Sequence, residues 1–364
     1  MTNCLRIATR KGLFIYEKNS ALSPSGWHLE RTAFIGDPVS NVFTDARNGD
    51  QYAALNLGHF GVKLHRAEAG SDDWQEISVP KYPSSDDDTE GSSLAQIWTL
   101  EAADPNRAGS LWAGTIPGGL FKSDDRGDSW QLVESLWQRP ERSEWFGGGY
   151  DDPGIHSICV DPRDSQRLLV AISCGGVWES LDAGANWTLQ GKGLRADYMP
   201  PDASDALVAQ DPHRLVVCPA QPDIAWIQHH NGIFHSRDGG RQWREITGVQ
   251  PSVFGFAVAV HPQDAETAWF LPAVKDECRV PVDGKLVVTR TRDGGRSFET
   301  LDRGLPAEAA YDLVWRHALD IDASGTHLAF GSTTGNLWLS DNQGDDWHCL
   351  SQHLPPINAV RFDP

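Results

Sequence analysis

The chain has 364 residues, of which 40% are hydrophobic and 15 are tryptophan. That is enough apolar material for one large core, so a single domain over residues 1–364 is expected. The formal net charge of −19 repels phosphate backbones and anionic lipid surfaces, which excludes nucleic acid and membranes as expected partners.

The first residues, Met1 to Gly12, hold no apolar run long enough for a secretion signal, and no later stretch reaches the length of a membrane span. A cytoplasmic location is therefore expected. The six cysteines lack CxxC spacing, which favours free thiols over disulfides. They are Cys4, Cys159, Cys174, Cys218, Cys278 and Cys349.

Taken in order, the chain begins with an apolar stretch, Leu5 to Thr9, that has the pattern of a strand. Two tryptophans then follow short polar turns, at Ser25-Gly26-Trp27 and at Gly70-Ser71-Asp72-Asp73-Trp74. A clearer turn motif with the same aromatic end comes next, in five copies at residues 123–130, 180–187, 236–243, 291–298 and 340–347. The chain finishes with a second apolar stretch, Ile357 to Pro364.

The repeated motif is Ser/Thr-x-Asp/Asn-x-Gly-x-x-Trp/Phe, and each part suits a tight turn between antiparallel strands. The Asp or Asn accepts hydrogen bonds from turn N–H groups, the Gly takes a positive φ, and the ring packs beside the next strand. The copies start at 123, 180, 236, 291 and 340, so they are 57, 56, 55 and 49 residues apart. A period near fifty with several short strands per unit is typical of a β-propeller.

The motif resembles the Asp-box, or BNR repeat, of sialidases, sortilin-type receptors, xyloglucan-cleaving glucanases and photosystem II assembly factors. The resemblance implies an all-β fold, a β-propeller, and it implies little about function because those families share little chemistry. The catalytic set of sialidases cannot be transferred. Where that family has an Arg-Ile-Pro type motif, this chain has Arg6-Ile7-Ala8, and few arginines are available to clamp a carboxylate.

Five clear boxes and two worn ones make seven units, each predicted to hold four strands with the box between the third and the fourth. Leu5 to Thr9 matches a second strand with no first strand before it, and Ile357 to Pro364 matches a first strand with no unit after it. Pairing the two would close a seven-bladed ring and remove the exposed sheet edge.

Four connections are longer than hairpins need, namely Pro80 to Leu94, Trp137 to Ile155, Gly193 to Pro212 and Pro272 to Lys285. The second contains residues 145–154, a segment too rich in glycine and aromatic residues to be a spacer. Long ordered loops on a rigid scaffold are common binding sites. In a propeller these loops gather at the channel mouth, at the opposite end from the boxes, so the boxes are predicted to be structural.

Aligning the first strands on their Asp-Pro ends places His156, His213 and His317 at one level. Aligning the second strands adds Arg10, His59, Cys174 and His230 at the same mouth. Three imidazoles with open positions suit a divalent transition metal such as Zn, Fe, Cu or Mn. There are two alternatives: the histidines form a polar site without a metal, or they have no functional role.

The first functional hypothesis is a small-molecule enzyme with this site, in which Asp152, Tyr150 and Glu277 act in catalysis and Arg10, His59, Trp145, His230 and Arg316 bind the substrate. Asp151 and Asp211 are further nearby carboxylates. The second is a glycoside hydrolase acting on a saccharide through paired carboxylates, Asp151 or Asp152 with Glu277. The third is a non-enzymatic binding or assembly propeller.

Overall fold

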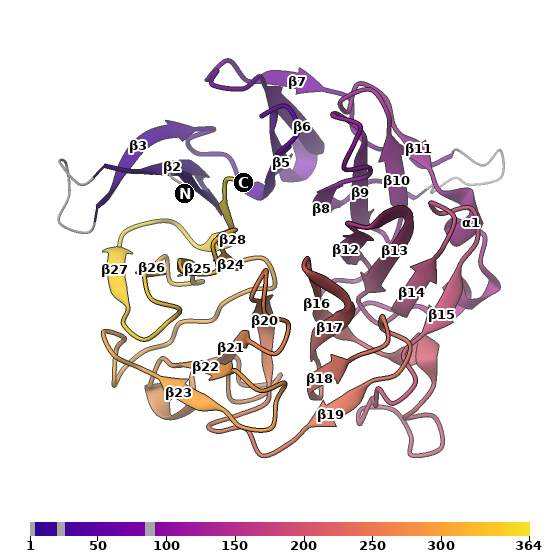
Figure 1. Ribbon diagram of the computed structural model, residues 1–364. Coiled ribbons are helices and arrows are strands. Elements are labelled where there is room, and N and C mark those ends of the chain that lie inside the picture. The colour runs from indigo at the N-terminus through magenta and orange to yellow at the C-terminus, as the bar shows by residue number, and fades with distance from the viewer. Residues whose placement is uncertain (1–3, 20–25, 84–91) are drawn as a thin grey trace. The chain divides into compact units, whose positions relative to one another are not determined.

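The computed structural model describes residues 4–19, 26–83 and 92–364. They form seven antiparallel sheets of four strands each (Figure 1), which is the predicted number of units. The chain divides into two compact units, which are described separately. Unit 1 comprises residues 1–39, 192–197 and 213–364, and unit 2 comprises residues 40–191 and 198–212.

Unit 2 contains three sheets, except for Val39, the first residue of β4. The first sheet has the order β4-β5-β6-β7, with β4 Val39–Thr44, β5 Gln51–Asn56, β6 Val62–Ala67 and β7 Gln75–Ile77. The second has the order β11-β10-β9-β8, with β8 Gln96–Ala102, β9 Leu111–Ile116, β10 Leu120–Ser123 and β11 Gln131–Leu132. The third runs β12-β13-β14-β15, with β12 Ile155–Asp161, β13 Asp164–Ile172, β14 Gly176–Ser180 and β15 Thr188–Gln190.

Unit 1 holds the other four sheets. In three of them the strands follow chain order. The first of these has β16 Pro212–Cys218, β17 Gln221–His229, β18 Gly232–Ser236 and β19 Arg244–Ile246. The next has β20 Gly255–Val260, β21 Ala268–Pro272, β22 Val288–Thr291 and β23 Glu299–Leu301, and the third has β24 Leu319–Ile321, β25 Leu328–Gly331, β26 Leu337–Ser340 and β27 His348–Ser351. The fourth has the order β28-β1-β2-β3, with β28 Ile357–Phe362, β1 Cys4–Thr9, β2 Gly12–Lys18 and β3 Trp27–Ala33.

The sheet that joins the two ends of the sequence confirms the predicted pairing. Strand β28 runs antiparallel to β1, with Leu5 opposite Phe362 and Ile7 opposite Val360 (Figure 1). The side chain of Arg6 adds a bidentate ion pair with Asp363, at 2.6 and 2.7 Å. The last strand therefore covers the edge of β1 that would otherwise offer unpaired N–H and C=O groups.

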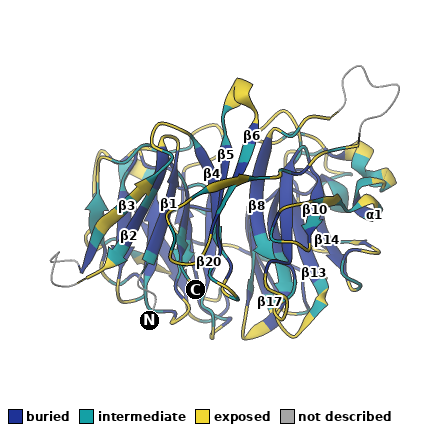
Figure 2. Cartoon of the chain, turned by 90° about the horizontal axis from the view of Figure 1, so that it is seen from above, coloured by how far each residue is buried: buried dark blue, intermediate teal, exposed yellow. Residues whose placement is uncertain are grey.

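Burial follows the position of a strand within its sheet. Every residue of β9 is buried, and β1 is buried apart from its first residue, because such strands have side chains packed against both of their faces. The outer strand β3 is mostly exposed or half-buried (Figure 2). Helices in the described part are single turns: α1 Glu134–Trp137, η1 Gly58–Phe60, η2 Pro140–Glu144, η3 Leu207–Ala209 and η4 Val282–Gly284. No described helix has the length and hydrophobicity that a membrane crossing requires.

The five clear boxes share one set of hydrogen bonds. In the first, Ser123 Oγ donates to Asp125 Oδ1 at 2.8 Å and accepts from Gly127 N at 2.8 Å, while Asp125 Oδ1 accepts from Ser129 N at 2.9 Å. The same three bonds recur in each of the other boxes. The box oxygens thus satisfy turn N–H groups, as a structural role requires.

The two worn boxes also precede an outer strand. Trp27 opens β3 and is buried, and Trp74 lies directly before β7. Ser25 of the first worn box lies outside the described residues, as does the middle of the connection from Pro80 to Leu94.

Candidate functional site

The glycine-rich segment 145–154 of unit 2 leads into β12 and folds tightly against the end of its own sheet. A Cβ atom on Gly147 would lie 2.1 Å from the carbonyl oxygen of Tyr150. A Cβ atom on Gly148 would lie 3.0 Å from both Ser173 Oγ and Cys174 Sγ, and 3.4 Å from Asp211 Oδ2. Glycine is required here because the backbone of the segment lies directly on neighbouring atoms.

Three aromatic side chains of unit 2 remain solvent-accessible around this segment. Tyr150 is 48% exposed, and Phe146 and Tyr198 are each 38% exposed. Phe146 and Tyr198 meet edge to face at 6.4 Å between ring centroids. Tyr150 packs edge-on against Trp98 at 5.3 Å, so its ring has a fixed support. Exposed aromatic rings held by a rigid scaffold are suited to ligand contact.

Asp211 lies beneath the segment and is only 4% exposed. Its Oδ1 accepts hydrogen bonds from Cys174 N at 3.2 Å and from Ser173 Oγ at 3.4 Å. Burial raises the pKa of Tyr198, and the charge of Asp211 raises it further. Tyr198 therefore stays protonated, and its hydroxyl donates to the carbonyl of Ala209 at 2.5 Å.

The predicted catalytic and binding residues of segment 145–154 have different environments. Asp151 and Asp152 are exposed, so their carboxyl groups are accessible to a ligand. Trp145 is not a surface residue, because it is 7% exposed and packs edge to face against Trp178 in the core. Trp145 thus supports the segment from below, and its role in substrate binding stays a prediction.

A second cluster, in unit 1, surrounds the ring of Phe256. His213 stacks on that ring at 4.3 Å between centroids, and the guanidinium groups of Arg279 and Arg316 each lie 5.3 Å from it. His213 Nδ1 lies 2.7 Å from the carbonyl oxygen of Gly255. A carbonyl only accepts, so Nδ1 of His213 donates this hydrogen bond, as the non-ligating nitrogen of a metal-bound histidine often does.

His230 is the other imidazole of this cluster, with its ring centroid 5.5 Å from that of His213. Of the three predicted metal ligands, this cluster of unit 1 contains His213, and its second imidazole comes from His230, which was predicted to bind substrate.

The remaining two predicted metal ligands are buried elsewhere in their own units. His156 is fully buried in unit 2, with Nδ1 2.9 Å from Ser157 Oγ and its ring edge-on to Trp98 at 5.4 Å. His317 is 4% exposed in unit 1, where its carbonyl accepts from Val360 N at 2.8 Å. Its backbone thus ties the last sheet to β28.

The other predicted site residues lie on loops at strand ends. Arg10 follows β1 in unit 1, and His59 lies in η1 of unit 2; both are exposed. Glu277 is also exposed and pairs with Lys275 at 3.4 Å. A backbone hydrogen bond and the charge of Lys275 lower its pKa, which makes Glu277 a poor general acid. Asp152 and Glu277 belong to different units.

Phe146, Tyr198 and Phe256 were not predicted as site residues. Phe256 lies six residues before Pro262, which is the spacing that His156 and His213 have to Pro162 and Pro219, so that signal is present in the sequence. Phe146 lies within the segment that glycine content marked as a loop. Nothing in the sequence indicates that Tyr198 packs against Phe146.

Comparison with known proteins gives no matching family model. The oligoxyloglucan-reducing end-specific xyloglucanase of Emericella nidulans is 27% identical over 220 residues, which is 58% of this chain and 24% of that protein. The chain thus spans about a quarter of that curated relative.

Solved structures extend the likeness to the whole chain. The GH74 xyloglucanase of Xanthomonas campestris superposes with a TM-score of 0.65 at 17% identity, covering 100% of this chain and 52% of that one. YCF48 bound to a D1 peptide gives a TM-score of 0.54 at 11% identity, covering 86% and 81%. At such identities the likeness is one of fold alone, and that fold is the predicted all-β, seven-bladed β-propeller.

Proposed function

We propose that this chain is a saccharide-binding propeller of the glycoside hydrolase kind, and that its ligand is a β-glucan oligosaccharide such as a xyloglucan fragment. The observation that carries the proposal is the set of exposed aromatic rings on unit 2, Phe146, Tyr150 and Tyr198. Pyranose rings present apolar C–H faces that stack on aromatic side chains, and their hydroxyls pair with nearby polar groups. The names of the xyloglucanase relatives support the choice of ligand.

Binding is tested by titrating xyloglucan oligosaccharides into the whole chain and measuring heat. Tyr150→Ala and Phe146→Ala should each weaken binding by about 2- to 13-fold, because one aromatic contact is worth roughly 0.5–1.5 kcal/mol. Leu181→Ala is the matched control, since Leu181 is 60% exposed in unit 2 but belongs to a box. Equal affinity in the aromatic variants and the control would refute the proposal.

Hydrolysis of the bound saccharide requires more than binding, because glycosidases need two carboxyl groups flanking the scissile bond. Unit 2 offers exposed Asp151 and Asp152, and buried Asp211 beneath the same segment. If the chain cleaves xyloglucan, Asp152→Asn should lower the release of reducing ends by at least about 100-fold, within the range of lost acid–base catalysis. Glu277→Gln should leave the rate nearly unchanged, since Glu277 is exposed and paired with Lys275.

We also propose that a divalent transition metal binds at the imidazoles of His213 and His230 in unit 1, whose ring centroids are 5.5 Å apart. Imidazole is a ligand that zinc and iron accept, and two imidazoles leave coordination positions open. Protein dialysed after exposure to zinc should retain about one ion per chain, and His213→Ala or His230→Ala should abolish retention. His59→Ala is the control on an exposed histidine. Wild-type protein that retains no metal, or equal retention in all variants, would contradict the site.

A further inference from the structure

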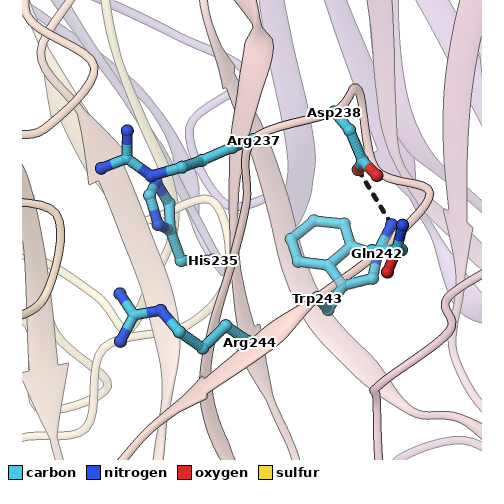
Figure 3. A pocket seen from close by; sticks show the side chains of 6 residues that line it. All are labelled: His235, Arg237, Asp238, Gln242, Trp243 and Arg244. Atoms are coloured by element: carbon cyan, nitrogen blue, oxygen red, sulfur yellow. Dashed lines mark hydrogen bonds between the residues drawn. The ribbon is translucent and has the colours of Figure 1, made fainter.

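A surface pocket of about 400 Å³ lies in unit 1 beside the third box. It is lined by His235, Arg237, Asp238, Gln242, Trp243 and Arg244 (Figure 3). None of these residues belongs to the saccharide or metal sites proposed above.

The sheet brings three nitrogen-rich side chains together in this pocket. His235 on β18 and Arg244 on β19 are direct cross-strand partners. Arg237 follows His235 by two residues, so the period of a strand directs both to the same face. Figure 3 shows the two guanidinium groups on either side of the imidazole of His235.

The imidazole of His235 is held in one position and is only 2% exposed. It stacks on Trp226 at 4.1 Å between centroids, and its Nε2 has no hydrogen-bond partner among the described residues. Burial and, to a smaller extent, the charges of Arg237 and Arg244 together lower the pKa of His235 to about 4. The ring is therefore neutral near pH 7 and presents one N–H donor and one acceptor.

The other charged groups of the pocket are only partly engaged by the protein. Asp238 is held inside the box, where its Oδ1 accepts from Gln242 N and from Ser236 Oγ, both at 2.9 Å. Arg237 pairs with Glu266 through one terminal nitrogen, and Arg244 donates to the carbonyl of Gly294 at 2.7 Å. Because a guanidinium has five N–H donors, both arginines keep donors for a ligand.

The equivalent place in the fourth box shows how the protein neutralises a cation there. Arg290 occupies the position of His235, and its cross-strand partner is Glu299, which occupies the position of Arg244. Glu299 forms an ion pair with Arg290, and Asp345 adds a second at 2.8 Å. In the third box an arginine replaces that glutamate, so the neutralising carboxylate is missing from the strand pair.

The remaining boxes carry other pairs at these two positions. They are Lys122 with Gln131, Glu179 with Thr188, and Leu339 with His348. Across the five boxes, which all lie within the described residues, only the third combines an imidazole with arginine on the facing strand and a second arginine two residues on.

We propose that this pocket binds a small oxyanion of the phosphate type, free or as part of a larger molecule. Two guanidinium groups and an imidazole N–H approach from different directions, which suits the several oxygens of a phosphate better than the planar pair of a carboxylate. The ligand supplies the negative charge that Glu299 supplies to Arg290 in the fourth box.

The test uses the whole chain and inorganic phosphate, at constant ionic strength adjusted with chloride. Phosphate should shift the imidazole NMR signals of His235 and raise the melting temperature with saturation. Arg237→Gln and Arg244→Gln should each weaken binding by about tenfold or more, because each removes a charge-assisted contact. Both side chains are at the surface, so neither substitution endangers folding.

Arg292→Gln is the matched control. Arg292 holds the same position in the fourth box as Arg237 does in the third, and it donates to Gln343 Oε1 at 2.9 Å. Its replacement should leave phosphate binding unchanged. A second titration with acetate separates the ligand classes, because tighter binding of acetate would overturn the phosphate preference. His235 signals that do not respond to excess phosphate, or a response equal in the Arg237 and Arg292 variants, would overturn the site.

Discussion

At the scale of single residues, the acid in each box acts as a hydrogen-bond acceptor for the turn. Asp293 accepts from Ser297 N at 2.9 Å and from Ser297 Oγ at 2.6 Å. These hydrogen bonds lower the pKa of Asp293 to about 2. In the fifth box Asn342 does the same work, with Oδ1 accepting from Asp346 N at 2.9 Å. The turn therefore requires the side-chain oxygen as a hydrogen-bond acceptor and does not require a negative charge on it.

This predicts how the box responds to substitution and to acid. Asp293→Ala should lower the free energy of unfolding by about 1 kcal/mol, as for a lost cap, whereas Asp293→Asn should cost much less. Because the folded pKa lies below the unfolded value near 3.8, the stabilisation is present above that value and is lost as pH falls toward 2.

Urea unfolding of the wild type and both variants from pH 5 to pH 2 measures this effect. The Asn variant should lose less stability on acidification than the wild type, because its side chain does not titrate. An Asn variant as unstable as the Ala variant at pH 5 would show that the charge, not the oxygen, supports the turn.

Sequence alignment of strands located the imidazoles but not their partners. It placed His213 and Phe256 at one level, and the structure stacks their rings. It could not show that His230, rather than His317, lies beside His213. His230 follows the end of β17, and the direction of a side chain in a loop cannot be inferred from an alignment of strands. Burial of Trp145 was equally beyond the sequence, because a tryptophan in a glycine-rich loop has the same pattern whether it supports the loop or faces a ligand.

At the scale of elements, the sheet that holds β28 and β1 depends on few residues. The side chain of Arg6 is 5% exposed in its ion pair with Asp363, and Asp363 N donates to the carbonyl of Cys4 at 3.0 Å. An interior charge left without its partner is costly, so this pair ties the two strands together more firmly than a surface pair would.

Removing one partner should therefore weaken the whole sheet. Asp363→Ala is expected to lower the free energy of unfolding by about 3 kcal/mol, because it removes the carboxylate that neutralises a guanidinium of only 5% exposure. Glu17→Ala is the control, since Glu17 pairs with Arg31 at 2.7 Å on the surface of the same sheet and should cost about 0.5 kcal/mol. Deleting residues from Pro356 onward should cost more than either.

Chemical denaturation monitored by tryptophan fluorescence gives these values. Equal losses for the Asp363 and Glu17 variants, or a truncated protein as stable as the wild type, would contradict the importance of β28.

The elements themselves were largely predictable, because turn chemistry and strand patterning are local properties. The five boxes and the outer strands after them follow from residues that act on near neighbours in sequence. The pairing of β28 with β1 was predictable for another reason, because each was the strand that the other's unit lacked. The connection from Gly193 to Pro212 was less accessible. Its one helical turn, η3, and the contact between Tyr198 and Phe146 depend on packing between segments distant in sequence.

At the scale of the whole molecule, the propeller fold does not by itself define a function. The chain shares its propeller with xyloglucanases and with YCF48, which the names describe as an enzyme and as a peptide-bound protein. A propeller is a scaffold that many functions use. What favours a saccharide here is the exposed aromatic set of unit 2, and no repeat or composition count could have selected it.

The pairing of β28 with β1 also affects the order in which the protein can be completed during synthesis. Arg6 and Asp363 are 357 positions apart, so β1 leaves the ribosome long before its inner neighbour has been translated. Throughout that interval the nascent chain carries a hydrophobic strand with one open edge, which is a hazard for premature association. The sheet that β1 begins is thus completed only after β28 has been translated, and closing it requires a contact of very high sequence separation, which makes this a slow step.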